Sequence, residues 1–162
     1  MCVMMFKNRG VTYMNEKLIA QAEKILAYRK RLDWGCLECC VLAQIDLDGY
    51  PTAATISPYK IEGIRRIYFC SGLGSNWVKR AQNCNRASVC FSSEEKQYNI
   101  TLVGTLEIVT DPEIKKEMWY EGLSYHLNGP EDPNYCVLRF DTMRYSLMLN
   151  EQDVNGSARG TL

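Results

Sequence analysis

Short turns between segments rich in apolar residues are the feature that most constrains the fold of this chain. Asp48-Gly49 separates the segments 39–47 and 51–57, and Asp-Gly in such a place is typical of a β-hairpin. Glu62-Gly63 and the polar segment 93–96 mark two further turns. Short turns join antiparallel neighbours, whereas parallel strands need long crossovers. We therefore expect a mainly β (α+β) fold, an antiparallel sheet or barrel with strands at 39–47, 51–57, 66–70, 86–92, 98–110 and 135–149.

A few helices should flank this sheet. Residues 15–31 carry apolar side chains on one stripe, from Leu18 to Leu26, with charged residues elsewhere, which indicates an amphipathic helix. Asp111 followed by Pro112 marks the start of another helix, because aspartate caps a first turn and proline fits its first position.

The segment 67–80 indicates a strand, a tight turn and the first turns of a helix. Gly72 and Gly74 allow the backbone to turn sharply. The helix start offers unpaired N–H groups and the positive end of the helix dipole, a combination that binds phosphate. The polar residues expected to take part are Ser71, Ser75, Asn76 and Lys79.

Two other interpretations of this turn remain open. Gly72-Leu73-Gly74 between a strand and a helix resembles a dinucleotide-binding fingerprint, with Glu94 and Glu95 about 20 residues further on, where a ribose-binding acid is expected. Trp77 stands where that fingerprint has its third glycine, and too little chain follows for further βαβ units. The turn could also be an ordinary capped helix whose Lys79 is solvated.

The composition predicts one domain and excludes several classes of protein. The 162 residues include 19 basic and 19 acidic ones, so no general basic face for nucleic acid is indicated. No apolar run approaches the roughly 18 residues that a membrane-spanning helix needs. The start of the chain lacks the pattern of a secretory signal, so we expect a cytoplasmic protein. The expected division is a flexible tail at 1–13, a domain at 14–150 and a second flexible tail at 151–162.

The eight cysteines are expected to be reduced thiols. Cys36, Cys39 and Cys40 form a C-x-x-C-C motif that raises the alternative of a cysteine-based metal or redox protein. No second pair with similar spacing is visible, and the single histidine, His126, has no ligand-like neighbour in sequence. We therefore predict no metal site.

Taken together, the order of elements and several motifs resemble the pyridoxamine 5'-phosphate oxidase-like family of FMN-binding split barrels. The resemblance covers about residues 15–149. It implies a six-stranded antiparallel split β-barrel with flanking helices, in which two subunits form the flavin sites at their interface. The motifs that carry it are 48–57, 67–71, 75–79, 85–91 and 100–107.

The resemblance also implies which residues contact FMN. The strand 53–57 would run beside the isoalloxazine ring, with Thr55 or Ser57 as contacts. Asn99 would reach the flavin from the partner subunit. The residues implied to hold the FMN phosphate are the ones that the turn itself suggests, namely Ser71, Ser75, Asn76 and Lys79.

Two departures from the family pattern limit the function. True pyridoxamine phosphate oxidases have an arginine in the second strand, where this chain has Ala53-Ala54. They also have an Arg-x-His near the C-terminus, where this chain has Arg144 and no histidine. We therefore expect a homodimeric FMN-binding oxidoreductase of a small molecule that is not a true pyridoxamine phosphate oxidase. A non-catalytic flavin- or haem-binding protein is the alternative.

Overall fold

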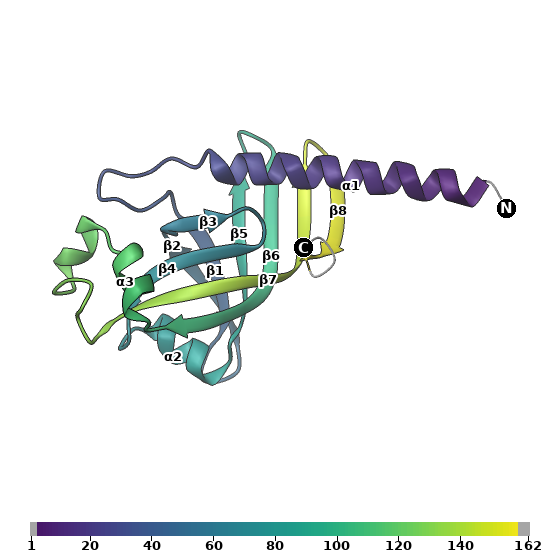
Figure 1. The fold of residues 1–162 in the computed structure, drawn as a ribbon. Coiled ribbons are helices and arrows are strands. Elements are labelled where there is room, and N and C mark those ends of the chain that lie inside the picture. The colour runs from purple at the N-terminus through teal and green to yellow at the C-terminus, as the bar shows by residue number, and fades with distance from the viewer. Residues whose placement is uncertain (1–2, 159–162) are drawn as a thin grey trace.

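An antiparallel sheet of eight strands forms most of the molecule (Figure 1). The computed structural model describes the backbone of residues 3–158 and the side chains of residues 15–158. The strands are β1 (Cys40–Ile45), β2 (Pro51–Ile56), β3 (Lys60–Glu62), β4 (Arg66–Gly72), β5 (Arg86–Ser93), β6 (Tyr98–Val109), β7 (Tyr135–Leu149) and β8 (Gln152–Ser157). The helices are α1 (Val3–Ala27), α2 (Asn76–Asn83), α3 (Pro112–Glu117) and the 3₁₀ helix η1 (Glu121–Tyr125).

The strands follow the order β2-β1-β5-β6-β7-β4-β3, and β8 pairs with β7 beside this path. All the pairings are antiparallel. The sheet curls around the main core and forms an antiparallel split β-barrel, as expected from the sequence. The expected count of six strands was too low, because it missed the three-residue β3 and the C-terminal β8.

The long strands β6 and β7 bend where their pairing shifts, between Val103 and Gly104. Before the bend, β7 pairs with β4 as far as Asp141; after it, β7 pairs with β8 from Arg144 onward. A Cβ atom on Gly104 would lie 2.0 Å from the carbonyl oxygen of Asp141. The two backbones can approach this closely only because residue 104 has no side chain.

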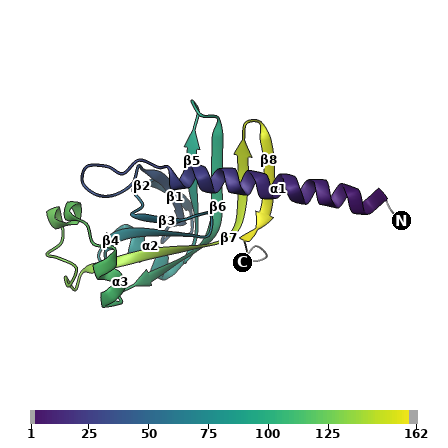
Figure 2. The same ribbon diagram turned by 45° about the horizontal axis from the view of Figure 1, so that its top comes forward.

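Helix α1 lies across β5, β6, β7 and β8 in both views of the ribbon (Figures 1 and 2). Leu18, Ala22 and Leu26 are buried in the main core, which also contains Leu147 of β7 and Val154 of β8. The apolar stripe predicted from the sequence is therefore the buried face of this helix. The helix begins at Val3 and not near residue 15, so the predicted start was wrong.

A second, smaller core lies under α3 and η1. Asp111 caps α3 by accepting hydrogen bonds from the N–H groups of Glu113 and Ile114 at 3.0 and 3.1 Å. Met118 packs there with Tyr135, which is fully buried. The predicted helix start at Asp111 is therefore confirmed.

The predicted tails need correction where the structure describes them. Residues 3–13 are part of α1, and residues 152–157 form β8, a strand paired with β7. The C-terminal segment looked like a tail because only Val154 and Ala158 among its described residues are buried apolar side chains. Residues 1–2 and 159–162 of the predicted tails lie outside the described residues. In the described part of the chain, no helix combines the length and the apolar character needed to cross a membrane.

We expect Gly104→Ala to lower the free energy of unfolding by about 1–3 kcal/mol, because the new methyl group must push β6 away from β7. Gly74→Ala is the matched control, since a Cβ atom there has no neighbour within 4 Å and its backbone dihedral is ordinary. Chemical denaturation of both variants checks this. Equal midpoints for Gly104→Ala and the wild type would show that the bend does not require glycine.

Candidate functional site

The predicted phosphate turn joins the end of β4 to the start of α2. Ser75 is the N-cap of α2, and its hydroxyl oxygen accepts a hydrogen bond from the N–H of Val78 at 3.3 Å. The hydroxyl groups of Ser71 and Ser75 lie 2.8 Å apart and share a hydrogen bond. The structure thus brings Ser71, at the end of the strand, into contact with the helix start.

The first turn of α2 adds donors beside these two hydroxyl groups. The N–H groups of Asn76 and Trp77 are in the first helical turn, where no intrahelical acceptor exists. Lys79 lies one turn after Ser75 and is exposed. Backbone N–H groups, hydroxyl groups and a cation at a helix N-terminus form a site suited to a phosphate group.

A loop far away in sequence supports this turn. Asn134 accepts hydrogen bonds from the N–H of Leu73 on its carbonyl oxygen, at 2.7 Å, and from the N–H of Gly74 on its Oδ1, at 3.3 Å. Asp132 in turn accepts from the N–H groups of Asn128 and Asn134, both at 2.8 Å. These backbone donors hold the pKa of the Asp132 carboxyl group below its usual range. Sequence reasoning missed Asn134, since nothing in the loop sequence indicates a partner 60 residues away.

Gln44 connects the same helix to β1. Its side chain is 2% exposed, and its Nε2 donates a hydrogen bond to the carbonyl oxygen of Trp77 at 2.9 Å. In the part of the chain that is described, its Oε1 has no hydrogen-bond partner. A polar residue in an otherwise apolar strand interior was the available sequence signal for this contact.

The other predicted contacts lie on the outer face of the sheet, the side directed away from the main core. Strand alternation places Thr55 beside Val41 on this face, because their neighbours Ile56, Cys40 and Leu42 pack in or against the core. Ser57 lies just after β2, and its hydroxyl is 3.2 Å from the Cys39 sulfur. Five side chains of the central strands form the middle of this face: Ala43, Ser88, Cys90, Thr101 and Val103.

Asn99 also belongs to the outer face, but it is remote from the phosphate turn. Its Oδ1 accepts a hydrogen bond from the Thr101 hydroxyl at 2.8 Å. It is the second residue of β6, beside the β5–β6 turn and α1, whereas α2 lies at the opposite end of the sheet (Figure 1). One chain therefore does not bring Asn99 and the phosphate turn together.

Arg144 is exposed on the same outer face. It pairs with Val103 of β6 and with Ser157 of β8. Arg144 and Val103 line two adjoining hollows, of about 410 and 460 Å³. The guanidinium group is therefore in the middle of the face and not at a strand end.

The three cysteines of the C-x-x-C-C motif have separate surroundings. Cys40 is buried in the main core, and burial raises the pKa of its thiol to about 12. Cys39 is exposed beside Ser57, and Cys36 is buried. Among the described residues all cysteines are free, and no three or more histidine, cysteine, aspartate or glutamate side chains gather as metal ligands.

The fold is that of a split-barrel protein, and its β4–α2 turn presents hydroxyl and N–H groups at a helix start. A family model for "pyridoxamine 5'-phosphate oxidase like" proteins matches residues 35–146, and the chain belongs to this family. The resemblance seen in the sequence is thus confirmed. No curated protein matches the chain significantly.

Several solved structures share the fold. A protein from Clostridium acetobutylicum related to general stress protein 26 of Bacillus subtilis has a TM-score of 0.74 and 20% identity, covering 91% of this chain and 99% of its own. General stress protein 26 from Bacillus anthracis has a TM-score of 0.65 and 18% identity, covering 86% and 97%. A haem-binding protein from Mycobacterium smegmatis has a TM-score of 0.66 and 14% identity, covering 88% and 58%. At these identities the likeness shows the fold alone.

We expect Ser75→Ala to lower the free energy of unfolding by about 1 kcal/mol, because the N–H of Val78 loses its capping acceptor. Ser75→Asp should keep wild-type stability, since aspartate also caps a helix and favours its dipole. Urea denaturation measures both variants. If the Ser75→Ala variant is as stable as the wild-type protein, the Ser75 cap does not stabilise the turn.

Proposed function

We propose that this protein binds FMN as a homodimer and is an oxidoreductase acting on a small molecule. The observation that carries the proposal is the contact between the Ser71 and Ser75 hydroxyl groups at the start of α2. Beside it lie the first-turn N–H groups of α2, and Lys79 follows one turn later, so hydroxyl and amide donors meet where a lysine is within reach. A phosphate monoester has three terminal oxygens that accept such bonds.

The support for a flavin over a bare phosphate comes from the outer face of the sheet. Ala53 and Thr55 of β2 are exposed, and β2 is an edge strand that pairs only with β1. In the described structure the other edge of β2 has no strand partner, and its backbone N–H and C=O groups are suitable partners for the polar edge of a flat heteroaromatic ring. Thr55 and Ser57 are the side chains that we assign to this contact.

FMN, when bound, supplies the electron transfer, and the protein contributes binding and orientation. In our assignment Ser71, Ser75, Asn76 and Lys79 fix the phosphate, and β2 orients the ring. His126, the chain's one histidine, is exposed after η1 and lies in neither part of the site. We therefore assign no acid–base residue to the reaction.

Two features of the chain support a dimer. Five central side chains of the outer face, Ala43, Ser88, Cys90, Thr101 and Val103, are uncharged and only partly exposed, with Arg144 beside them, and the face ends in the free edge of β2. Asn99 is the second residue of β6, and this strand begins at the end of the sheet opposite α2 (Figure 1). In a two-fold dimer that joins the outer faces, Asn99 of one copy contacts the flavin held by the other.

A spectrum of the purified protein tests the proposal directly. The protein is expressed, FMN is added, excess cofactor is removed, and the visible spectrum is recorded. We expect stoichiometric flavin absorbance and micromolar or tighter affinity. If the protein neither copurifies with flavin nor binds added FMN, the proposal is refuted.

Haem is the second candidate cofactor, because a haem-binding protein from Mycobacterium smegmatis shares the fold over most of this chain. Titration with haemin in the same spectroscopic experiment separates the two cofactors. A non-catalytic binder of either cofactor would show no turnover with NADH or NADPH and no reoxidation that depends on a substrate.

Lys79→Ala should weaken FMN binding by about 1.5–3 kcal/mol, because the phosphate loses a charge-assisted hydrogen bond. Ser75→Asp should weaken it too, by placing a carboxylate against the phosphate while keeping the helix cap. Lys116→Ala, which removes an exposed lysine of α3, is the matched control. Fluorescence titration of FMN gives the three affinities, and wild-type affinity in Lys79→Ala would mean that this lysine is only solvated.

Ser88→Arg should convert the dimer to a monomer and lower FMN affinity at the same time, since a second long cationic side chain would enter the middle of the outer face beside Arg144 and repel it. Ser124→Arg makes the same change at an exposed serine of η1 and should alter neither property. Sedimentation velocity and FMN titration provide the two measurements. A monomeric Ser88→Arg protein with unchanged FMN affinity would contradict a site shared between subunits.

A further inference from the structure

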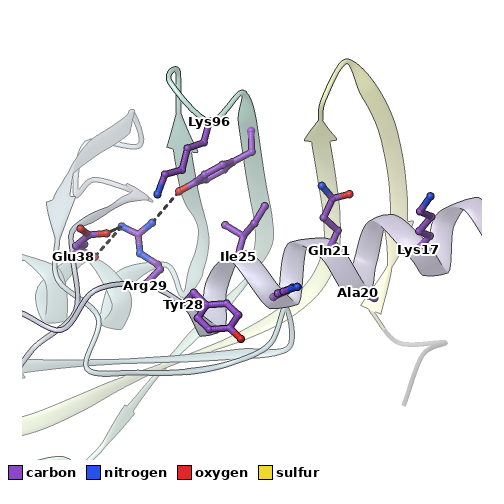
Figure 3. Close-up of a pocket in the computed structure, with 10 residues that line it drawn as sticks. Lys17, Ala20, Gln21, Ile25, Tyr28, Arg29, Glu38 and Lys96 are labelled. Atoms are coloured by element: carbon purple, nitrogen blue, oxygen red, sulfur yellow. Dashed lines mark hydrogen bonds and ion pairs between the residues drawn. The ribbon is translucent and has the colours of Figure 1, made fainter.

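A second pocket lies between α1 and the β5–β6 turn (Figure 3). This turn is at the end of the sheet opposite α2 (Figure 1). Its volume is about 730 Å³, which is within the usual range of small-molecule sites. None of the residues assigned to FMN lines it. The lining residues are Lys17, Ala20, Gln21, Lys24, Ile25, Tyr28, Arg29, Glu38, Lys96 and Tyr98.

Positive charge dominates this lining. Lys17, Lys24, Lys96 and Arg29 supply four cations, against the one carboxylate of Glu38. Lys17 and Lys24 lie on the same side of α1, two helical turns apart. In Figure 3 the amino group of Lys96 points toward the guanidinium group of Arg29. Two cations directed at one place repel each other unless an anion lies between or beside them.

Arg29 is the best-buried of these cations, with a side chain that is 8% exposed. Its guanidinium group lies 5.0 Å from the centre of the Phe91 ring. Its hydrogen bonds go to neutral oxygens, including the carbonyl of Cys39 at 2.7 Å and the hydroxyl of Tyr98 at 3.4 Å.

The charge of Arg29 is therefore only weakly balanced. Among the described side chains, its one ion-pair partner is Glu38, whose Oε2 lies 3.9 Å from Nη2 and whose side chain is 47% exposed. Among the described residues, nothing accepts a hydrogen bond from its Nε. Buried charges are normally paired closely. In the described part of the chain, this guanidinium group is balanced only by a carboxylate that is 3.9 Å away and half-exposed.

The rest of the pocket is suited to an apolar group. Ile25 and Ala20 on α1 provide aliphatic surface, and Tyr98 provides an aromatic side chain. Tyr28, just after the end of α1, is 79% exposed and provides a second aromatic side chain. A flat apolar molecule in the pocket would cover these side chains and leave its charged end beside Arg29 and Lys96.

We propose that this pocket binds a small organic anion with a flat apolar body and one carboxylate or phosphate group. Arg29 and Lys96 hold the anionic group, and Lys24 increases the positive electrostatic potential around it. The apolar body of the ligand contacts Ile25, Tyr28 and Tyr98. The site is separate from the phosphate turn and does not depend on the cofactor.

Binding of 2-naphthoate to the full chain tests this proposal, with 2-naphthylmethanol as a neutral probe of similar shape. Both are titrated into the protein with and without saturating FMN, using calorimetry. We expect one naphthoate per chain, affinity that falls as salt concentration rises, and at least about tenfold weaker binding of the neutral probe. Absence of saturable naphthoate binding, or equal affinity for both probes, would overturn the proposal.

Substitutions of lysines inside and outside the pocket test where naphthoate binds. Lys24→Gln and Lys96→Gln should each weaken naphthoate binding by about two- to fivefold, and the double variant by about the product. Lys116→Gln should leave the affinity unchanged, and so should Lys79→Ala, because neither lysine lines this pocket. Unchanged affinity in the double variant, or loss of naphthoate binding in Lys79→Ala, would also refute the assignment.

Discussion

The close approach of β6 and β7 at Gly104 is the constraint on which the remaining structure depends. At this point the carbonyl of Asp141 occupies the space that a side chain at residue 104 would need. The Asp141 carboxylate accepts hydrogen bonds from Nε of Arg66 at 2.6 Å and from Nε of Arg139 at 3.0 Å. These bonds fix the end of the β4–β7 pairing. Beyond this point β7 pairs with β8 instead of β4. The long strands β6 and β7 therefore belong both to the barrel and to the part of the sheet that packs against α1.

The bend in β6 and β7 divides the sheet into two halves, and each half carries different residues of the proposed sites. The barrel half carries β4 and α2, and with them the phosphate turn that Asn134 and Gln44 support. The extended half carries Asn99 and the cationic pocket beside α1. The outer face of β1, β5 and β6 joins the two halves, and its small side chains leave room for a flat ligand or a second subunit. A two-fold dimer is the arrangement that would let both halves serve one cofactor.

Local sequence signals predicted the parts of the structure that depend on neighbouring residues. Asp48-Gly49, the cap at Asp111 and the turn before α2 were found because each rests on contacts within a few positions. Strand β8 was missed because only Val154 of its residues shows a buried position, which gives no alternating pattern. Asn134 was missed because its role depends on contacts across 60 residues. For the site, the phosphate turn followed from its own residues, whereas Thr55, Ser57 and Asn99 came only from the family resemblance.

The packing of α1 has a consequence for how the protein is made. Its apolar stripe is buried in the same core as Leu147 and Val154, yet α1 ends at Ala27 whereas β7 begins only at Tyr135. During synthesis Leu18, Ala22 and Leu26 leave the ribosome long before the strands that cover them. The nascent chain therefore carries an exposed apolar helix until its last strands emerge. Chaperones that bind such helices can bind the chain during that interval.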